Sequence, residues 1–414
     1  MKAIPCPQVS FSFSSCKFVP YTFDTAPSHQ TQVFHSITDV PFNIIKKWVS
    51  PETLAVMSGT ESAKIPGMEF RYALFYREGI PAIFACFQIF SFSARQTGEY
   101  ASSPEKADNF SGKVKNLLAR IAKNIMEKRQ IRLLVSGNVL LTGQPGYYCD
   151  PFVPENEGLS LLPTIINEIL SNTPDIDAIL LKDHLCLPET VSEEWQKQGF
   201  TPFETEPNMV LPIVWKSVND YHLDMSSKYR QRVKSAYKKS DELLRRELNL
   251  SEVIRYKDRL FELFHSVLKE DRFNMVSHSP EYLPSLKTLL EDQFRVLGYF
   301  RGDDLVAFQT LILKKEEFDA HFLGYHCDLN HEYKLYQRML YDAVAIAIEE
   351  GFNRISFGRT AMEIKSAVGA VPEYPVCYLK FTRPIVNRLA VPFLRNVKTE
   401  AWQPRHPFKP MILV

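Results

Sequence analysis

The sequence lacks the cysteine patterns that hold zinc or build a disulfide framework. Its 7 cysteines are scattered and odd in number, and none of them forms a CxxC pair. We therefore expect reduced thiols in a cytoplasmic protein, and no metal site. Long hydrophobic runs are also missing, because the most apolar stretch, residues 80–90, is much shorter than the roughly 20 residues that span a bilayer. No membrane span is expected.

An excess of either charge is absent as well. The formal net charge is +1, so the global charge does not indicate a polyanionic partner. Hydrophobic residues make up 45% and aromatic residues 12% of the chain, which argues against an intrinsically disordered protein. With 414 residues, the chain is long enough for two domains with separate cores.

The most informative part of the chain lies between residues 318 and 370. It begins with an alternating run that predicts a strand at 318–325, followed by an apolar helix at 332–350 and a second strand at 354–358. This order predicts one crossover unit with two parallel strands. The alternation places Asp319 and His321 on the strand face opposite Phe318 and Phe322. Ligands of parallel sheets bind at the carboxyl ends of the strands, so we expect the functional site at that edge.

A faint internal duplication is present. The predicted hairpin at residues 74–84 has the same layout as residues 298–308, and a strand–helix–strand unit follows each of them. An amphipathic helix is expected at 113–128, and a strand at 249–253. The sequence thus predicts five parts. They are an irregular or edge-strand segment (1–40), a first domain (41–215), a basic connecting helix (216–247), a second domain (248–382) and a Pro-rich basic tail (383–414).

The order of elements over 248–382 is strand, two helices, a three-strand meander, a helix, a strand, a polar turn and a strand. Together with the turn at 358–369 that contains Lys365, this order resembles the GNAT acyltransferase fold. The duplicated layout and the basic helix between the copies are similar to the Fem-type branch, which pairs two GNAT-like domains and includes peptidoglycan aminoacyltransferases. The resemblance implies an α/β fold (α+β, with mixed sheets) of two tandem GNAT-like acyltransferase domains, with the second domain active.

The resemblance also implies a function. The expected activity is N-acyltransfer to a small-molecule amine acceptor, with acyl-CoA or another activated acyl carrier, such as an acyl carrier protein, as the donor. One alternative is an aminoacyltransferase that uses aminoacyl-tRNA, as in Fem-type members. A second alternative is a non-catalytic GNAT-like protein that binds an acyl ligand.

Four residues are predicted to be catalytic. In the GNAT-like fold, the amine meets the acyl carbonyl between the two parallel strands, so Asp319 or His321 would remove a proton from the amine. Tyr325 would act as general acid toward the leaving group. Lys365, in a turn that is expected to be exposed, would stabilise negative charge on the acyl oxygen or on a donor phosphate.

Donor and substrate binding are assigned to the same edge of the sheet. Cations at the start of the 332–350 helix oppose the helix dipole, and a bound phosphate would resolve the conflict. Donor binding is therefore predicted for Lys334, Gln337, Arg338 and Arg359, and substrate binding for Glu363. One departure from the resemblance is that residues 330–335 carry no glycine, whereas acyl-CoA-binding GNAT domains have a glycine-rich loop there.

A basic helix is expected over 220–247. Its lysines and arginines can follow a phosphate backbone, although a solvated helix face explains the same pattern.

Overall fold

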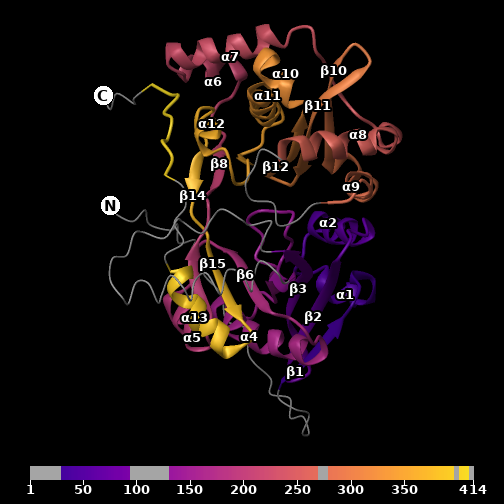
Figure 1. Ribbon diagram of the computed structural model, residues 1–414, viewed down its shortest axis with the longest axis vertical. Helices are drawn as coiled ribbons and strands as arrows, with labels where there is room; N and C mark the ends of the chain where they lie inside the picture. The colour runs from indigo at the N-terminus through magenta and orange to yellow at the C-terminus, as the bar shows by residue number, and fades with distance from the viewer. Residues whose placement is uncertain (1–28, 94–129, 269–277, 396–400, 410–414) are drawn as a thin grey trace, which may run out of the picture.

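The computed structural model describes residues 29–93, 130–268, 278–395 and 401–409. The described residues form two domains stacked along the long axis of the molecule, each with its own mixed sheet and its own covering helices (Figure 1). The lower sheet in this view has eight strands and the upper sheet has seven. The predicted α/β class with two mixed sheets is confirmed.

The strands of the lower sheet are β1 (His29–Phe34), β2 (Met68–Arg77), β3 (Ile80–Ser93), β4 (Gln130–Ser136), β5 (Tyr147–Cys149), β6 (Ala178–His184), β7 (Thr201–Glu204) and β15 (Val376–Phe381). The strands of the upper sheet are β8 (Asn208–Pro212), β9 (Leu244–Glu247), β10 (Phe294–Arg301), β11 (Asp304–Leu313), β12 (Glu317–Tyr325), β13 (Arg354–Ser356) and β14 (Val371–Glu373).

The described α-helices are α1 (Phe42–Ile45), α2 (Pro51–Ser62), α4 (Glu155–Asn172), α5 (Glu189–Lys197), α6 (Val218–Asp224), α7 (Ser227–Lys239), α8 (Leu250–Leu268), α9 (Tyr282–Leu290), α10 (Cys327–Tyr333), α11 (Leu335–Glu349), α12 (Met362–Ser366) and α13 (Pro384–Leu394). Short 3-10 helices cover Ile37–Asp39 and Glu291–Gln293. The helix predicted at 113–128 lies outside the described residues. None of the described helices is both long and apolar enough to cross a membrane.

The two sheets repeat one plan of strand pairing. The lower sheet has the order β1-β2-β3-β4-β6-β15-β7, and the upper sheet, taken from its other end, has the order β9-β10-β11-β12-β13-β8-β14. In both sheets the fourth and fifth strands are parallel and every other neighbouring pair is antiparallel. The faint duplication in the sequence therefore corresponds to two copies of one layout.

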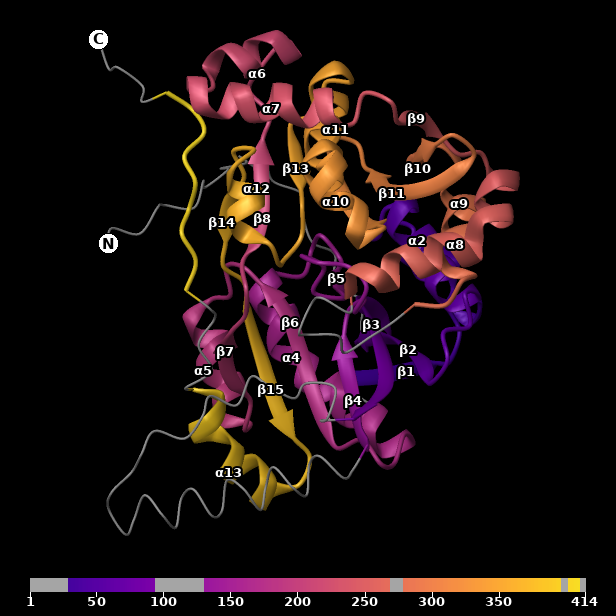
Figure 2. The same cartoon turned by 45° about the horizontal axis from the view of Figure 1, so that its top comes forward.

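The two sheets exchange one strand each. β8, from the predicted first domain, lies between β13 and β14 of the upper sheet, and β15, from the predicted second domain, lies between β6 and β7 of the lower sheet. Figures 1 and 2 show β15 running beside β6 in the lower domain, although the strands β9 to β14 of the second half lie above it. The sequence boundaries at 215 and 382 therefore do not separate the two sheets, since each half of the chain completes the other's sheet.

The α11 helix is the centre of the upper core, as its pattern predicts. Leu335, Met339, Ala343, Val344 and Ala347 are each fully buried. One side of α11 covers the sheet, and its outer side packs on α7 (Figure 2). The predicted start of the helix is wrong, because Lys334 is left-handed (φ +51°) and separates α11 from the short α10.

The predicted basic helix over 220–247 is also wrong as a single element. Met225 is extended at the end of α6 and forms a bridge with Phe408, so a new helix, α7, begins at Ser227. Residues 244–247 form the edge strand β9 beside β10. The strand predicted at 249–253 is instead the first turn of α8, where Asn249 accepts a hydrogen bond from Glu252 N at 3.0 Å.

The segment predicted to be a Pro-rich tail has two structured parts. Residues 384–394 form α13 on the lower domain, and residues 401–409 run along the upper domain. Phe408 packs on Trp215 and Tyr221. Gly369 (φ +102°) lies beneath it, where a Cβ atom would come within 2.5 Å of the Phe408 ring. Glycine at this position is thus required both by the backbone and by the docked segment.

Candidate active site

The two parallel strands of the upper sheet separate soon after they begin. β12 and β13 pair only through Glu317–Arg354, Phe318–Ile355 and Asp319–Ser356. Beyond Ser356 the chain turns toward β8, since Phe357 N donates to Met209 O at 2.8 Å. β12 continues to Tyr325, so a gap opens between the two strands at the edge of the sheet where the sequence predicts a site.

A β-bulge lies at the point where β12 leaves β13. Two residues, His321 and Phe322, face the single residue Thr310 on β11. The Thr310 hydroxyl accepts a hydrogen bond from Phe322 N at 2.9 Å. Because of the bulge, Phe322 turns to the same side as His321 and stacks on its ring at 3.9 Å between centroids. The simple alternation predicted for this strand, with Phe322 beside Phe318, is therefore wrong.

A loop from the lower domain closes this region. We call residues 137–146, which follow β4, the interdomain loop. Its Leu140 and Leu141 are buried in the upper domain's core cluster with Tyr282 and Phe308. The loop is pinched at its base, where Gly137 and Gly146 are both left-handed and a Cβ atom on Gly146 would lie 2.1 Å from Gly137 N. Only glycines allow the loop to close in this way.

A buried ion cluster at the end of β6 fixes the interdomain loop. Lys182 Nζ donates to Leu141 O at 2.7 Å and to Asn138 O at 3.2 Å. Asp183 Oδ2 accepts a hydrogen bond from Gly143 N at 2.8 Å and lies 2.6 Å from Lys182 Nζ. Asp183 is left-handed (φ +65°), a strained conformation for aspartate that turns its carboxylate toward the junction.

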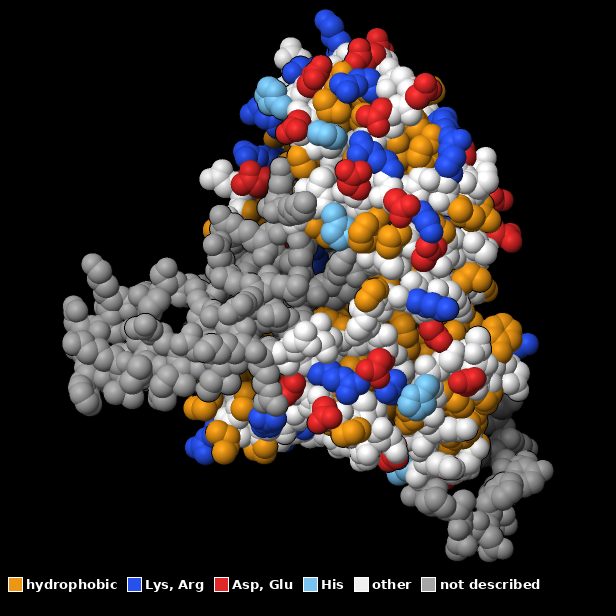
Figure 3. Space-filling model, turned by 45° about the vertical axis from the view of Figure 1, so that its right-hand side comes forward, with side chains coloured by type: hydrophobic (Ala, Val, Ile, Leu, Met, Phe, Trp, Pro, Cys, Tyr) orange, Lys and Arg blue, Asp and Glu red, His pale blue; other side chains and the backbone are white. Residues whose placement is uncertain are grey.

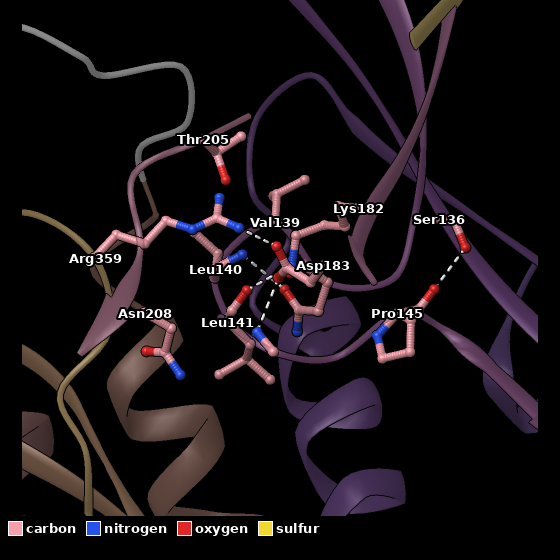
Figure 4. A network of polar contacts seen from close by, with 12 residues as sticks. Ser136, Val139, Leu140, Leu141, Pro145, Lys182, Asp183, Thr205, Asn208 and Arg359 are labelled. Atoms are coloured by element: carbon pink, nitrogen blue, oxygen red, sulfur yellow. Dashed lines mark hydrogen bonds and ion pairs between the residues drawn. The ribbon is translucent and has the colours of Figure 1, made fainter. Parts of the chain in front are cut away.

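Arg359 joins this cluster from the other domain. It follows β13, and its Nη2 pairs with Asp183 Oδ1, as Figure 4 shows. Burial alone would raise the pKa of the Asp183 carboxyl, but Lys182 and Arg359 outweigh burial and lower that pKa. The three side chains carry two positive charges and one negative charge, so the cluster has an excess of one positive charge. Arg359 Nε is buried and has no hydrogen-bond partner among the described residues.

His321 lies beside the interdomain loop. Its Nε2 is 3.2 Å from the Tyr282 hydroxyl, its Nδ1 is 3.2 Å from the Thr310 hydroxyl, and it hydrogen-bonds to the backbone of Leu140. Burial, and then the neighbouring His278, lower the pKa of His321 to about 3. The imidazole is therefore neutral at physiological pH and is a poor proton acceptor there.

Asp319 lies in the last pair before the strands separate, and it faces the lower domain. It lines a small pocket between the domains together with Glu52, Thr53, Leu141 and Lys314. Burial raises the pKa of the Asp319 carboxyl despite the opposing effect of Lys314, whose Nζ lies 3.0 Å away. Of the predicted proton acceptors, Asp319 thus has the pKa shift that favours general base catalysis.

Tyr325 lies on the other side of the sheet from His321. Its ring packs with the α11 cluster and makes an edge contact with Tyr336 at 6.2 Å. Tyr325 is 7% exposed, and its carbonyl accepts a hydrogen bond from the Ser266 hydroxyl. The structure does not bring its hydroxyl together with Asp319 and His321.

Lys365 and Glu363 have different surroundings from those predicted. Lys365 is buried, at 4% exposed, whereas the sequence predicts an exposed residue. Its Nζ donates to Gly358 O at 3.3 Å and to Arg359 O. It holds the loop that carries Arg359, so its position supports a positioning role. Glu363 points away toward residues 401–409, where it pairs with Arg405 at 2.5 Å, and this hydrogen bond lowers the pKa of Glu363.

The burial of Lys365 gives a testable prediction. Replacing Lys365 with alanine should lower the free energy of unfolding by about 1–3 kcal/mol, because two backbone carbonyls would lose their donor. Replacing the exposed Lys315 in the same way should change it by no more than about 0.5 kcal/mol. Urea unfolding measures both values. A Lys365 variant with unchanged stability and lost activity would instead place its charge at the reaction centre.

The residues predicted to bind the donor phosphate are dispersed. Arg338 is committed to a buried network, since its Nε donates to Asp342 Oδ2 at 3.0 Å and its Nη1 to the Ser240 hydroxyl at 2.8 Å. Asn330 Oδ1 accepts a hydrogen bond from Tyr336 N at 3.1 Å and so caps the start of α11. Gln337 Oε1 is buried, with no partner among the described residues. Of the four predicted residues, Arg359 alone lies at the interdomain junction.

The sequence did not reveal the residues that the lower domain contributes to the site. Lys182, Asp183 and the interdomain loop were not assigned a role. One signal was available, because Lys182 and Asp183 stand at the carboxyl end of an apolar strand, where parallel sheets place functional groups. The three glycines of the loop were a second signal.

Among the described residues, no group of three or more His, Cys, Asp and Glu side chains could hold a metal ion. The five described cysteines, Cys86, Cys149, Cys186, Cys327 and Cys377, form no disulfide with one another.

Comparison with known proteins bears on this geometry. Residues 227–366, which run from α7 to α12 and include the separated strands, match the family model described as Acetyltransferase (GNAT) domain. Over most of its length the chain also resembles the crystal structure of FemX, with a TM-score of 0.50, 11% sequence identity, and coverage of 86% of this chain and 99% of that chain. The chain has the GNAT acyltransferase fold. A search of curated proteins finds no match.

Two further solved structures are similar to this chain at lower scores. One is a tandem GNAT protein from the clavulanic acid biosynthesis pathway, with a TM-score of 0.49, 9% identity, and coverage of 86% of this chain and 99% of that chain. The other is the C-terminal domain of a putative lysylphosphatidylglycerol synthetase from Agrobacterium fabrum, with a TM-score of 0.44, 10% identity, and coverage of 86% and 95%.

Proposed function

We propose that the protein is an N-acyltransferase that moves an acyl group from an activated donor to a small-molecule amine. The observation that carries this proposal is the separation of β12 from β13 beside a bulge, within the segment that matches the GNAT domain. The gap leaves the edge of β12 beyond Asp319 unpaired with β13, so that edge can align an extended acyl donor. An excess positive charge, on Arg359, lies at the end of β13.

The proposed chemistry assigns separate roles to these groups. The amine nitrogen attacks the acyl carbonyl carbon, a C–N bond forms, and the carbonyl oxygen takes up negative charge. Asp319 accepts the proton that the nitrogen loses, and Arg359 stabilises the developing negative charge. The bond to the carrier then breaks, and the carrier leaves with a proton. His321 stays neutral and positions Leu140 of the interdomain loop.

The identity of the donor is a separate question. GNAT domains generally bind acyl-CoA, and a glycine-rich loop before the central helix holds the pyrophosphate. Here α10 occupies that stretch, residue 334 is a left-handed lysine, and Asn330 already caps the start of α11. These residues do not fit a pyrophosphate, which favours a different activated carrier.

This misfit supports aminoacyl-tRNA as a second candidate donor, in place of acyl-CoA. The lysines of α7 that face solvent, Lys228, Lys234, Lys238 and Lys239, supply the positive charge that a tRNA backbone requires. An acyl carrier protein, which is acidic, would use the same charges.

Ligand-dependent stability tests the donor. We expect aminoacyl-tRNA or an acyl carrier protein at a hundred times its dissociation constant to stabilise the full chain by about 2.7 kcal/mol, and CoA or acetyl-CoA to have no effect. Thermal unfolding with each ligand measures this, and mass spectrometry then detects the amide product formed with an amine acceptor. Stabilisation by CoA would restore it as the donor. Binding without any amide product would identify a non-catalytic acyl-binding protein.

A further inference from the structure

The α13 helix, Pro384–Leu394, has exposed apolar side chains on its outer side. Its inner side is anchored by a polar residue, since Asn387 Nδ2 donates to Gly199 O at 2.8 Å and Asn387 Oδ1 accepts a hydrogen bond from Phe381 N at 2.9 Å. Three apolar side chains face outward. Ile385 is 77% exposed, Leu389 is 60% exposed and Val386 is 38% exposed. Leu389 lies four positions after Ile385 and three after Val386, so the three side chains form one apolar stripe.

Arginines flank this stripe along the segment that contains α13. Arg383, Arg388 and Arg395 are all exposed, and residues 382–395 contain no aspartate or glutamate. The chain as a whole carries a net charge of only +1. On the face shown in Figure 3, acidic and basic side chains are interspersed over the upper domain. The segment at α13 therefore has a local excess of positive charge that the rest of the chain compensates.

We propose that α13 is the element by which this protein lies on an anionic membrane surface. A helix with an exposed apolar stripe flanked by arginines inserts shallowly at the level of the headgroups, and anionic lipids attract its cations. The two hydrogen bonds of Asn387 hold the helix against β7 and β15, so the stripe is presented by a fixed surface of the lower domain. Such binding is peripheral and reversible.

Other occupants fit the charge pattern less well. In a symmetric dimer through this surface, the patch of one copy would meet the same patch of the other, and the arginines would repel each other. A nucleic acid would find no aromatic side chain among Ile385, Val386 and Leu389 for base stacking.

Vesicle co-sedimentation of the full chain tests the proposal. We expect binding to vesicles of phosphatidylcholine with phosphatidylglycerol, at least tenfold weaker binding to phosphatidylcholine alone, and weakening by salt. The double variant Ile385→Glu, Leu389→Glu should lose at least tenfold in binding to the anionic vesicles. Leu244→Glu is the matched control, because Leu244 on β9 is also a 60% exposed leucine. It should bind like the unmodified protein.

Three results would overturn the proposal. One is equal binding to both kinds of vesicle, or no binding to either. Another is a melting temperature that falls by several degrees in the double variant and not in Leu244→Glu, which would mean that this chain itself covers the stripe. The third is a change from dimer to monomer in the double variant without vesicles, which would assign the stripe to a second copy.

Discussion

Replacing Asp342 with alanine is expected to lower the free energy of unfolding by about 3–5 kcal/mol, because a largely buried arginine and two tyrosine hydroxyls would lose their shared partner. Asp342 lies on α11, with a side chain that is 2% exposed. Its carboxylate accepts hydrogen bonds from the Tyr237 hydroxyl at 2.9 Å, the Tyr299 hydroxyl at 2.8 Å and Arg338 Nε at 3.0 Å. Burial and the carboxylate raise the pKa of both tyrosines, so both hydroxyls stay protonated and continue to donate.

A matched exposed pair provides the control for this prediction. Glu193 lies 3.9 Å from Lys197 on α5, and its side chain is 60% exposed. Glu193→Ala should change stability by less than about 1 kcal/mol, because solvent screens such pairs. Urea unfolding of both variants gives the two values. Equal losses would show that the Asp342 network contributes no more than a surface ion pair.

Local pattern was sufficient to predict much of the fold. The hairpins β2–β3 and β10–β11 and the parallel pair around α11 follow from alternation, from helical spacing and from turn residues. The duplication could be recognised because both hairpins have the same layout and each is followed by a strand–helix–strand unit. These features depend on contacts between neighbouring segments, and so the sequence order determines them.

Features that depend on distant contacts could not be predicted in this way. β8 and β15 have the composition of strands, but nothing in their residues shows that each joins the other half's sheet. The break at Met225 results from its bridge to Phe408, which lies far along the chain. The bulge in β12 depends on the Thr310 hydroxyl of the neighbouring strand. Lys365 looks like a surface residue, because only the folded loop reveals the carbonyls that it binds.

The candidate site shows the same division. Asp319 and His321 could be selected because the alternation places them on the polar face of a predicted parallel strand, and Arg359 because it follows the carboxyl end of the next one. Asp183 could not be connected with Arg359, because the two residues belong to different domains and meet only in the folded chain. The absence of glycine from residues 330–335 was visible in the sequence, and the structure adds that Asn330 caps the helix there.

Replacing Arg359 with alanine is expected to lower kcat/KM by about 10²–10³, because the reaction would lose the cation that we place near the developing negative charge. The variant should still fold. Asp183 keeps Lys182 as a partner at 2.6 Å, so no buried carboxylate is left unpaired. Arg359→Lys should recover part of the loss, since it keeps the charge but not the planar fork that pairs with Asp183.

Steady-state kinetics with the donor and amine found by the ligand screen, alongside melting temperatures, tests this prediction. Arg405→Ala is the control, because Arg405 is a 40% exposed arginine that pairs with Glu363 away from the junction. A fall in kcat at constant KM would mean that Arg359 acts in the transition state, whereas a rise in KM alone would mean that it binds an anionic group of a substrate. Unchanged kcat and KM would limit Arg359 to joining the two domains through Asp183, and the excess positive charge at the junction would then have no part in acyl transfer.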